Sequence, residues 1–145
     1  MAQTIQLCTF FVDTLFLGIE VEKVQEIIRY QEMTRVPLAP DVVAGLINLR
    51  GQIVTAIDLR RRLNLSERAA EQLPLNAIVR TEAETVSLLI DDIGDVLEVS
   101  SDDFETPPDT FISHLRPMIR GSYKLPKQLL LFLDVEKVVE ITNNK

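Results

Sequence analysis

The sequence predicts an all-β protein with short helices, built from two small barrels that repeat one architecture. Apolar runs of four to eight residues, rich in Val, Ile, Leu and Phe, recur along the chain and are typical of strands. Two pairs of segments match at nearly the same interval: 24–28 with 93–97, and the Arg-Gly step at 50–51 with that at 120–121. Such self-similarity indicates duplication. Each half has about 70 residues, too few for an ample core of its own, so the halves are expected to pack together.

Each apolar run is interpreted as one strand. Turn-forming residues separate the runs, so antiparallel hairpins are expected. The segment 21–30 fits a helix or a strand. Its counterpart at 93–99 contains a glycine and many β-branched residues, which favours a short turn leading into a strand in both halves. The other predicted strands are 5–12, 15–21, 46–49, 53–59, 75–79, 86–90, 96–99, 119–123 and 129–133.

Helix is predicted only in short pieces. Asp58 and Asp134 each close an apolar strand, and each can accept backbone N–H bonds as the N-cap of the segment that follows it. A third short turn is expected at 40–43, where Pro40 stands near the first helical position. Small barrels finished by a short helix would leave few exposed strand edges.

One domain spanning residues 1–145 is expected, made of two barrel subdomains. The interval between the matching segments places these subdomains at roughly 15–80 and 81–145, with the N-terminal strand at 5–12 free to pair with the second.

Composition excludes several classes of function. The chain carries 22 acidic and 15 basic residues, for a net charge of −7, which argues against a nucleic-acid partner. A single cysteine, Cys8, excludes an intrachain disulfide, and the first residues lack the pattern of a signal peptide, so a cytoplasmic location is expected. No apolar run approaches the ~18–20 residues that span a bilayer, so any membrane association would be through a partner.

The sequence contains no constellation of catalytic residues. His114 is the only histidine, and a surface-loop position is the simplest interpretation of it, with a hydrolase using His114 as a remote alternative. Cys8 and His114 cannot make a zinc site, and the scattered glycines form no phosphate-binding loop. We therefore predict no enzymatic activity, no metal and no cofactor.

Four features are candidates for interaction sites, and each also has a plain structural interpretation. Arg50 before Gly51 fits a turn in which the glycine supplies positive φ and the arginine solvates the tip. Glu26 fits the wet face of a half-buried strand. The run 60–62, three arginines, fits the solvated side of a short helix. Core is the default interpretation of the aliphatic residues Val24, Ile53, Ile93 and Val96.

Four segments carry a resemblance that extends from about residue 6 to residue 141. The central one is the most specific, because it combines fixed spacing from Pro37 to Gly45 with Asn-Leu-Arg-Gly, an apolar strand and Asp-Leu. The segments are LGIEVEKVQEII (17–28), VPLAPDVVAGLINLRGQIVTAIDL (36–59), VSLLIDDIGDVL (86–97), and IRG followed by LLLFLDVEKVV (119–139). In this order they resemble CheW, the family of coupling proteins in bacterial chemosensory complexes.

The resemblance implies two pseudo-repeated, five-stranded SH3-like barrels packed around a shared hydrophobic core. It also implies a non-catalytic adaptor that couples the cytoplasmic tips of chemoreceptors to the regulatory domain of a CheA-type histidine kinase. Carried over by position, the receptor-facing residues are Val24, Glu26, Arg50, Gly51 and Ile53. No motif assigns the residues that contact the kinase.

Some alternatives stay open at this point. The adaptor could serve flagellar chemotaxis, pili or another two-component output, and a small-ligand-binding double barrel acting as a sensor is a further hypothesis. Two departures from the family pattern are expected to alter the second barrel locally: Ser87 stands where a glycine is usual, and residues 124–127 replace a common Asp or Gly turn.

Overall fold

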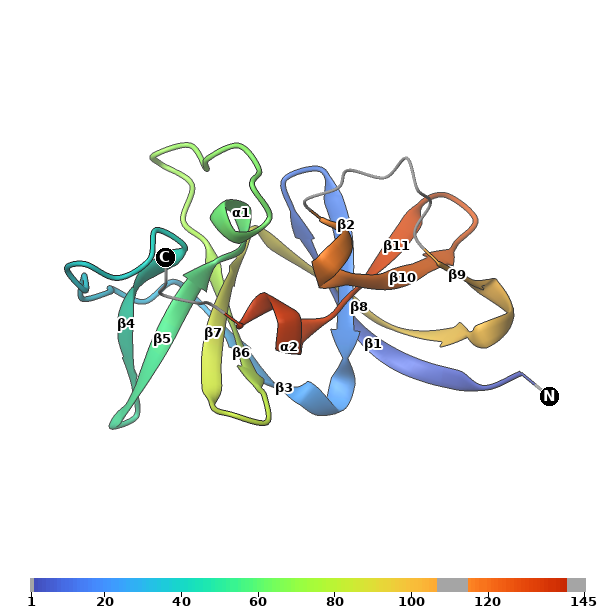
Figure 1. Ribbon diagram of the computed structural model, residues 1–145, viewed down its shortest axis with the longest axis horizontal. Helices are drawn as coiled ribbons and strands as arrows, with labels where there is room; N and C mark the ends of the chain where they lie inside the picture. Colours follow the sequence, from blue (N-terminus) through green and yellow to red (C-terminus); the bar gives the residue numbers. More distant parts are fainter. Residues whose placement is uncertain (1, 107–114, 141–145) are drawn as a thin grey trace.

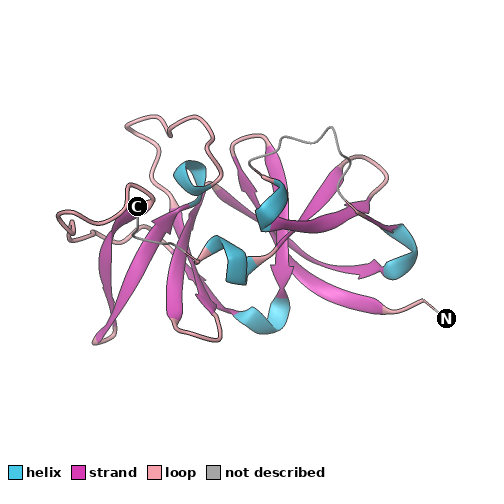
Figure 2. Cartoon of the chain, viewed as in Figure 1, coloured by secondary structure: helices cyan, strands magenta, loops and turns pink. Residues whose placement is uncertain are grey.

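The computed structural model describes residues 2–106 and 115–140 and confirms the all-β class (Figures 1 and 2). Two α-helical turns, α1 (Leu59–Arg62) and α2 (Val135–Val138), and three 3₁₀ turns, η1 (Val21–Lys23), η2 (Ser101–Asp103) and η3 (Arg116–Met118), interrupt the strands. The strands are β1 (Thr4–Val12), β2 (Leu15–Glu20), β3 (Val24–Ile28), β4 (Val43–Leu49), β5 (Gln52–Asp58), β6 (Leu75–Arg80), β7 (Thr85–Ile90), β8 (Asp92–Ser100), β9 (Phe104–Glu105), β10 (Ile119–Lys124) and β11 (Leu129–Leu133). As predicted, a short turn, η1, leads into β3.

The strands form two sheets that lie side by side in Figure 1. The five-stranded sheet has the order β3-β6-β7-β5-β4, and the six-stranded sheet has the order β8-β1-β2-β11-β10-β9. Their first five strands correspond in order and in direction, since each sheet has one parallel pair, β5 with β7 and β11 with β2, among antiparallel neighbours. The duplication is therefore confirmed, and the two-residue strand β9 is an addition to the second sheet.

The sheets divide the chain differently from the predicted boundaries at 15–80 and 81–145. Strand β2 lies in the six-stranded sheet, and β7 lies in the five-stranded sheet. Short turns explain both placements, because Asp13-Thr14 and the segment 81–84 join strands that pair with each other and so stay in one sheet. Strand β1 lies between β8 and β2.

The predicted match between the two Arg-Gly steps is wrong. Arg50-Gly51 forms the tip of the β4–β5 hairpin, whereas Arg120-Gly121 lies inside β10. Gly121 corresponds instead to Gly45, because each follows a shift of register between equivalent strands, in β10 against β11 and in β4 against β5. The chain interval between equivalent positions thus grows from 69 near β3 to 76 near β5, since the second half has a longer connection before its fourth strand.

A shared core holds the sheets together. Its largest cluster of buried residues takes Phe10, Leu17 and Ile19 from the six-stranded sheet and Ile57, Val79 and Leu88 from the five-stranded sheet, together with Leu59 of α1 and Val135 of α2. At ~25 cal/mol per Å² of apolar surface, each buried aliphatic side chain contributes roughly 1.5–3 kcal/mol. Neither sheet keeps this contribution without the other, as the size of the halves predicts.

Both helical turns start as predicted and pack near each other. Asp58 Oδ1 accepts a hydrogen bond from Arg60 N at 3.0 Å, and Asp134 Oδ1 accepts one from Lys137 N at 3.3 Å. Arg62 of α1 donates to the carbonyl oxygens of Val138 at 2.7 Å, Lys137 at 2.9 Å and Glu140 at 3.2 Å. One guanidinium from the first half therefore caps the C-terminal end of α2, where cations are favoured.

Candidate functional site

The tip of the β4–β5 hairpin holds two of the predicted site residues in a tight turn. Arg50 has φ +52° and Gly51 has φ +89°, and positive φ at both central residues is typical of a type I′ turn. Asn48 Oδ1 accepts a hydrogen bond from Gly51 N at 2.8 Å, which fixes the loop. The glycine supplies positive φ as predicted, but Arg50 adopts it as well, a conformation that costs a non-glycine residue about 1–2 kcal/mol.

Arg50 and Glu26 form an ion pair in which Arg50 Nη2 donates to Glu26 Oε2. Glu26 lies in β3 and Arg50 follows β4, which are the two edges of the five-stranded sheet. The pair therefore joins the edges of that sheet. The hydrogen bond from Arg50 lowers the pKa of Glu26, and the bond to Glu26 raises the pKa of Arg50. Gln25 also donates to Glu26, at 3.4 Å, and is held in turn by Arg80 Nη2 at 3.0 Å.

The remaining predicted residues differ in exposure. Ile53 pairs with Asn48 across the hairpin and is 62% exposed, so it stands beside the tip as an apolar side chain in solvent. Val24 is half-buried and packs against the shared core. Ile93 and Val96 of β8 are 49% and 55% exposed. The interpretation of these four as plain core is thus wrong for Ile53, Ile93 and Val96 and correct in part for Val24.

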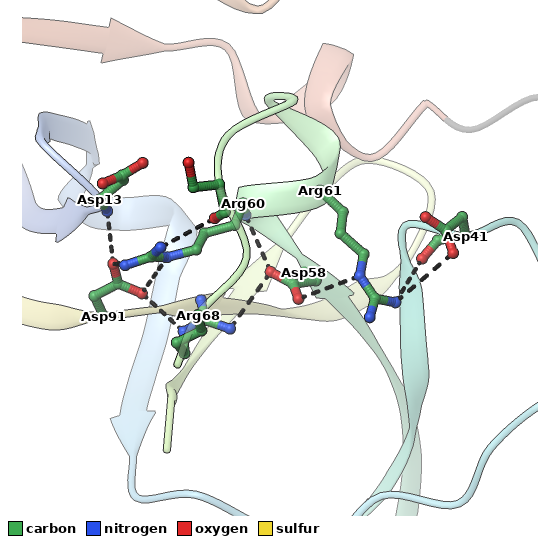
Figure 3. Close-up of polar contacts among 8 residues, drawn as sticks. Asp13, Asp41, Asp58, Arg60, Arg61, Arg68 and Asp91 are labelled. Atoms are coloured by element: carbon green, nitrogen blue, oxygen red, sulfur yellow. Dashed lines mark hydrogen bonds and ion pairs between the residues drawn. The ribbon is translucent and has the colours of Figure 1, made fainter. Parts of the chain in front are cut away.

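A buried charge network was missed by sequence reasoning (Figure 3). Asp91 lies between β7 and β8. Its carboxylate accepts hydrogen bonds from Arg60 Nη2 at 2.6 Å, from Arg68 Nε at 2.9 Å and from the backbone N–H of Asp13 at 2.6 Å. Arg68 Nη1 also lies 3.6 Å from Asp58 Oδ1. The network joins α1, the loop after α1, the β1–β2 turn and the junction between the sheets.

The run of three arginines is consequently not the solvated side of a helix. Arg60 is only 11% exposed and Arg62 is half-buried, while Arg61, more exposed, donates to the Asp41 carbonyl oxygen at 3.1 Å. The sequence did contain a clue that these arginines are not all solvated, because three of them follow one another on a one-turn helix directly after a buried strand. Successive residues on a helix point about 100° apart, so three in a row cannot all lie on the same side of it.

The charges in this network shift two pKa values. Burial acts to raise the pKa of Asp91, but the hydrogen bonds from Arg60, the Asp13 backbone and Arg68 outweigh it, so the pKa lies below its ordinary value. The hydrogen bond to Asp91 likewise raises the pKa of Arg60. Asp91 is therefore an ionised carboxylate that pairs with two guanidinium groups, and Asp58 supplies a second negative charge beside Arg68.

The two departures from the family pattern have local explanations. Ser87 Oγ donates to Asn76 Oδ1 at 2.7 Å, and Asn76 Nδ2 donates to the Arg29 carbonyl oxygen at 3.1 Å, so the buried serine satisfies a buried amide. In the 124–127 segment, Leu125 N donates to the Gln128 carbonyl oxygen at 3.0 Å and closes the β10–β11 hairpin.

Residues 2–106 and 115–140 contain no group of three or more metal-ligating side chains. Within the same ranges no helix is long and apolar enough to cross a membrane. His114 lies outside the described residues.

Comparison with known proteins identifies the family. The family model of the CheW-like domain matches residues 6–142. The chain belongs to the CheW-like domain family. Among curated CheW-like relatives, the chemotaxis protein CheW of Treponema pallidum is 31% identical over 92% of this chain and 81% of its own length. The chemotaxis protein CheW of Bacillus subtilis is 30% identical over 93% of this chain and 86% of its own length.

A solved CheW-like structure has the same fold. The scaffolding protein TtCheW from Thermoanaerobacter tengcongensis superposes with a TM-score of 0.86 over 98% of this chain and 97% of its own, at 22% identity. Family membership confirms the resemblance drawn from the four segments, and with it the predicted class of function, a chemotaxis adaptor.

Proposed function

We propose that this protein couples the cytoplasmic tips of chemoreceptors to the regulatory domain of a CheA-type histidine kinase, without catalysing a reaction itself. In this role it works in the cytoplasm and is attached to membrane receptor arrays only through its partners. The receptor-facing surface consists of Glu26, Arg50, Gly51 and Ile53, with Val24 at its buried margin.

The observation that carries this proposal is the arrangement at the β4–β5 tip. Arg50 is 66% exposed, held in a strained turn and fixed by Glu26, and it stands beside the exposed Ile53. Strained backbone at an exposed position is typical of functional sites. A fixed cation next to an apolar side chain suits the amphipathic face of a helix, such as a receptor helical hairpin, which offers apolar anchors at helical spacing.

The proposal is tested with receptor-containing membranes, the cognate kinase and the purified protein. Arg50→Glu places a like charge opposite Glu26 and should reduce recovery of the protein with receptor membranes at least about tenfold, which corresponds to ~1.4 kcal/mol. Kinase autophosphorylation in the three-component mixture should fall in parallel.

Two further variants separate binding from folding. Lys127→Glu makes the same change of charge at an exposed position in the turn between β10 and β11 of the other sheet, and it should leave recovery unchanged. The double variant Glu26→Arg with Arg50→Glu restores the ion pair with reversed charges, so it should recover thermal stability but not receptor binding. If wild-type protein changes neither recovery nor kinase activity, the adaptor proposal fails. If the double variant regains binding, Arg50 acts only on the fold.

A further inference from the structure

The loop from β3 to β4 and the loop after α1 enclose a pocket of about 470 Å³. It lies on the five-stranded sheet, next to the charge network of Figure 3. Its lining combines apolar and charged side chains, among them Leu38, Leu73, Arg61, Arg68, Asp41 and Asp58. The Glu26–Arg50 surface contributes none of the described lining residues, so the pocket is a separate feature.

The charge in the lining is opposite in sign to that of the whole protein. Three arginines, Arg35, Arg61 and Arg68, face two aspartates, whereas the chain as a whole has a net charge of −7. The network beneath the pocket also has more donors than acceptors. Arg68, with a side chain only 8% exposed, keeps Nη2 buried and without a hydrogen-bond partner among the described residues. This surplus of N–H donors favours an anionic acceptor.

The apolar part of the pocket stands at its rim. Leu38 is fully exposed and has φ +70°, a conformation that is rare for a leucine. Leu73, on the opposite loop, is 60% exposed, and Val36 is 38% exposed. An occupant that removes these side chains from water must be larger than an ion, because they come from two separate loops and are exposed. A small inorganic anion cannot do this, whereas a polypeptide can.

We propose that this pocket binds an acidic side chain of a partner protein, with a neighbouring apolar residue of the same segment packed between Leu38 and Leu73. The carboxylate would be received by Arg61, whose side chain is 37% exposed and whose guanidinium lies near Asp58 and Asp41. Two anchors of different kind, one charged and one apolar, give such a contact its selectivity. This site is independent of the proposed receptor-facing surface.

The test uses the complete protein and a pair of short peptides. One has the sequence Leu-Glu-Leu flanked by alanines with blocked ends, and the other differs only by Gln in place of Glu. In amide NMR titrations up to about 5 mM, near the ~1 mM range of weak binding, the acidic peptide should give saturable shifts at Leu38, Arg61 and Leu73. The Gln peptide should bind at least about tenfold more weakly, because a charge-assisted hydrogen bond is lost.

Two variants complete the test. Arg61→Gln should weaken the acidic peptide about tenfold and leave the affinity of the Gln peptide unchanged. Leu38→Asn suits positive φ and removes the apolar contact, so the melting temperature should stay the same or rise while both peptides bind more weakly. The proposal is overturned by equal affinity for the two peptides, by absence of saturable binding, or by shifts centred on Arg50 instead of the pocket.

Discussion

Replacing Asp91 by Asn is the sharpest test of how the charge network stabilises the fold. The substitution keeps the size of the side chain, so it creates no cavity, but it removes the negative charge between Arg60 and Arg68. The Asp91 side chain is only 9% exposed, and the two arginine side chains are 11% and 8% exposed. Water therefore cannot take over the role of the carboxylate.

The expected loss follows from the geometry. The carboxylate accepts bonds from Arg60 at 2.6 Å, Arg68 at 2.9 Å and the Asp13 backbone at 2.6 Å, and the variant leaves two buried cations facing a neutral amide. Removing one partner of a buried ion pair costs about 3–5 kcal/mol. For a chain of this length that corresponds to a fall in melting temperature of roughly 6–20 °C.

The pH dependence supplies a second, independent signature. The pKa of Asp91 is lower in the folded protein than its ordinary value of about 3.9. Its contribution to stability is thus fully present above pH ~4 and is lost as the pH falls through the folded pKa, where the unfolded state binds more protons. The Asn variant has no such group, so the stability difference between the two proteins should be largest near neutral pH and shrink in acid.

Urea unfolding followed by circular dichroism, at pH 7 and at several values below pH 4, measures both effects. A loss below about 1 kcal/mol at pH 7 would refute the reasoning, as that is typical of a solvent-exposed pair. A constant difference between the proteins across the acid range would also contradict it. A double-mutant cycle with Arg60→Ala then measures the coupling directly.

Three other substitutions have definite expectations. Arg50→Asn relieves the turn, since Asn tolerates positive φ, and should raise the free energy of unfolding by up to about 1 kcal/mol while receptor recovery falls; a loss of stability would contradict the strain argument. Ser87→Ala leaves the buried Asn76 oxygen without its donor and should cost about 1–3 kcal/mol in chemical unfolding, and a neutral result would mean that water replaces the hydroxyl. Gly121→Ala places a Cβ against the Phe104 ring and the Glu105 backbone oxygen, so thermal unfolding should show a loss of about 1–3 kcal/mol, and an unchanged stability would contradict this packing.

The elements that could be predicted from sequence are those fixed by local chemistry. Apolar runs bounded by turn residues marked nearly all the strands, and the Asp at the end of β5 and the Asp directly after β11 marked the start of each helical turn. The strand β9 escaped prediction because two residues carry no periodicity. It is held in place by pairing with β10 and by the packing of its own Phe104 against Tyr123, contacts between residues far apart in sequence.

The errors arose where long-range pairing decides the outcome. The match between Arg50-Gly51 and Arg120-Gly121 relied on identical residue types. The position equivalent to Gly121 is instead Gly45, because each of these glycines follows a shift of register against the adjacent strand. Composition likewise made the three arginines after Asp58 look solvated. Their partners, Asp91 and the end of α2, lie at distant positions in the chain, and no local sequence pattern indicates that they bind these arginines.

The arrangement of hairpins explains why an adaptor of this size can act as one rigid body. The first repeat consists of β1 to β5, and the second consists of β6, β7, β8, β10 and β11. Each repeat begins with a hairpin, β1–β2 or β6–β7, and this hairpin lies in the sheet that holds the last three strands of the other repeat. Separating the sheets would therefore expose the shared core and break the Arg62 and Asp91 contacts together. Because no part of this boundary can open alone at low cost, the hairpin tip at Arg50 keeps a fixed position relative to the six-stranded sheet. Partners bound at distant surfaces would then be held at a set distance and angle, which is the physical requirement for coupling them.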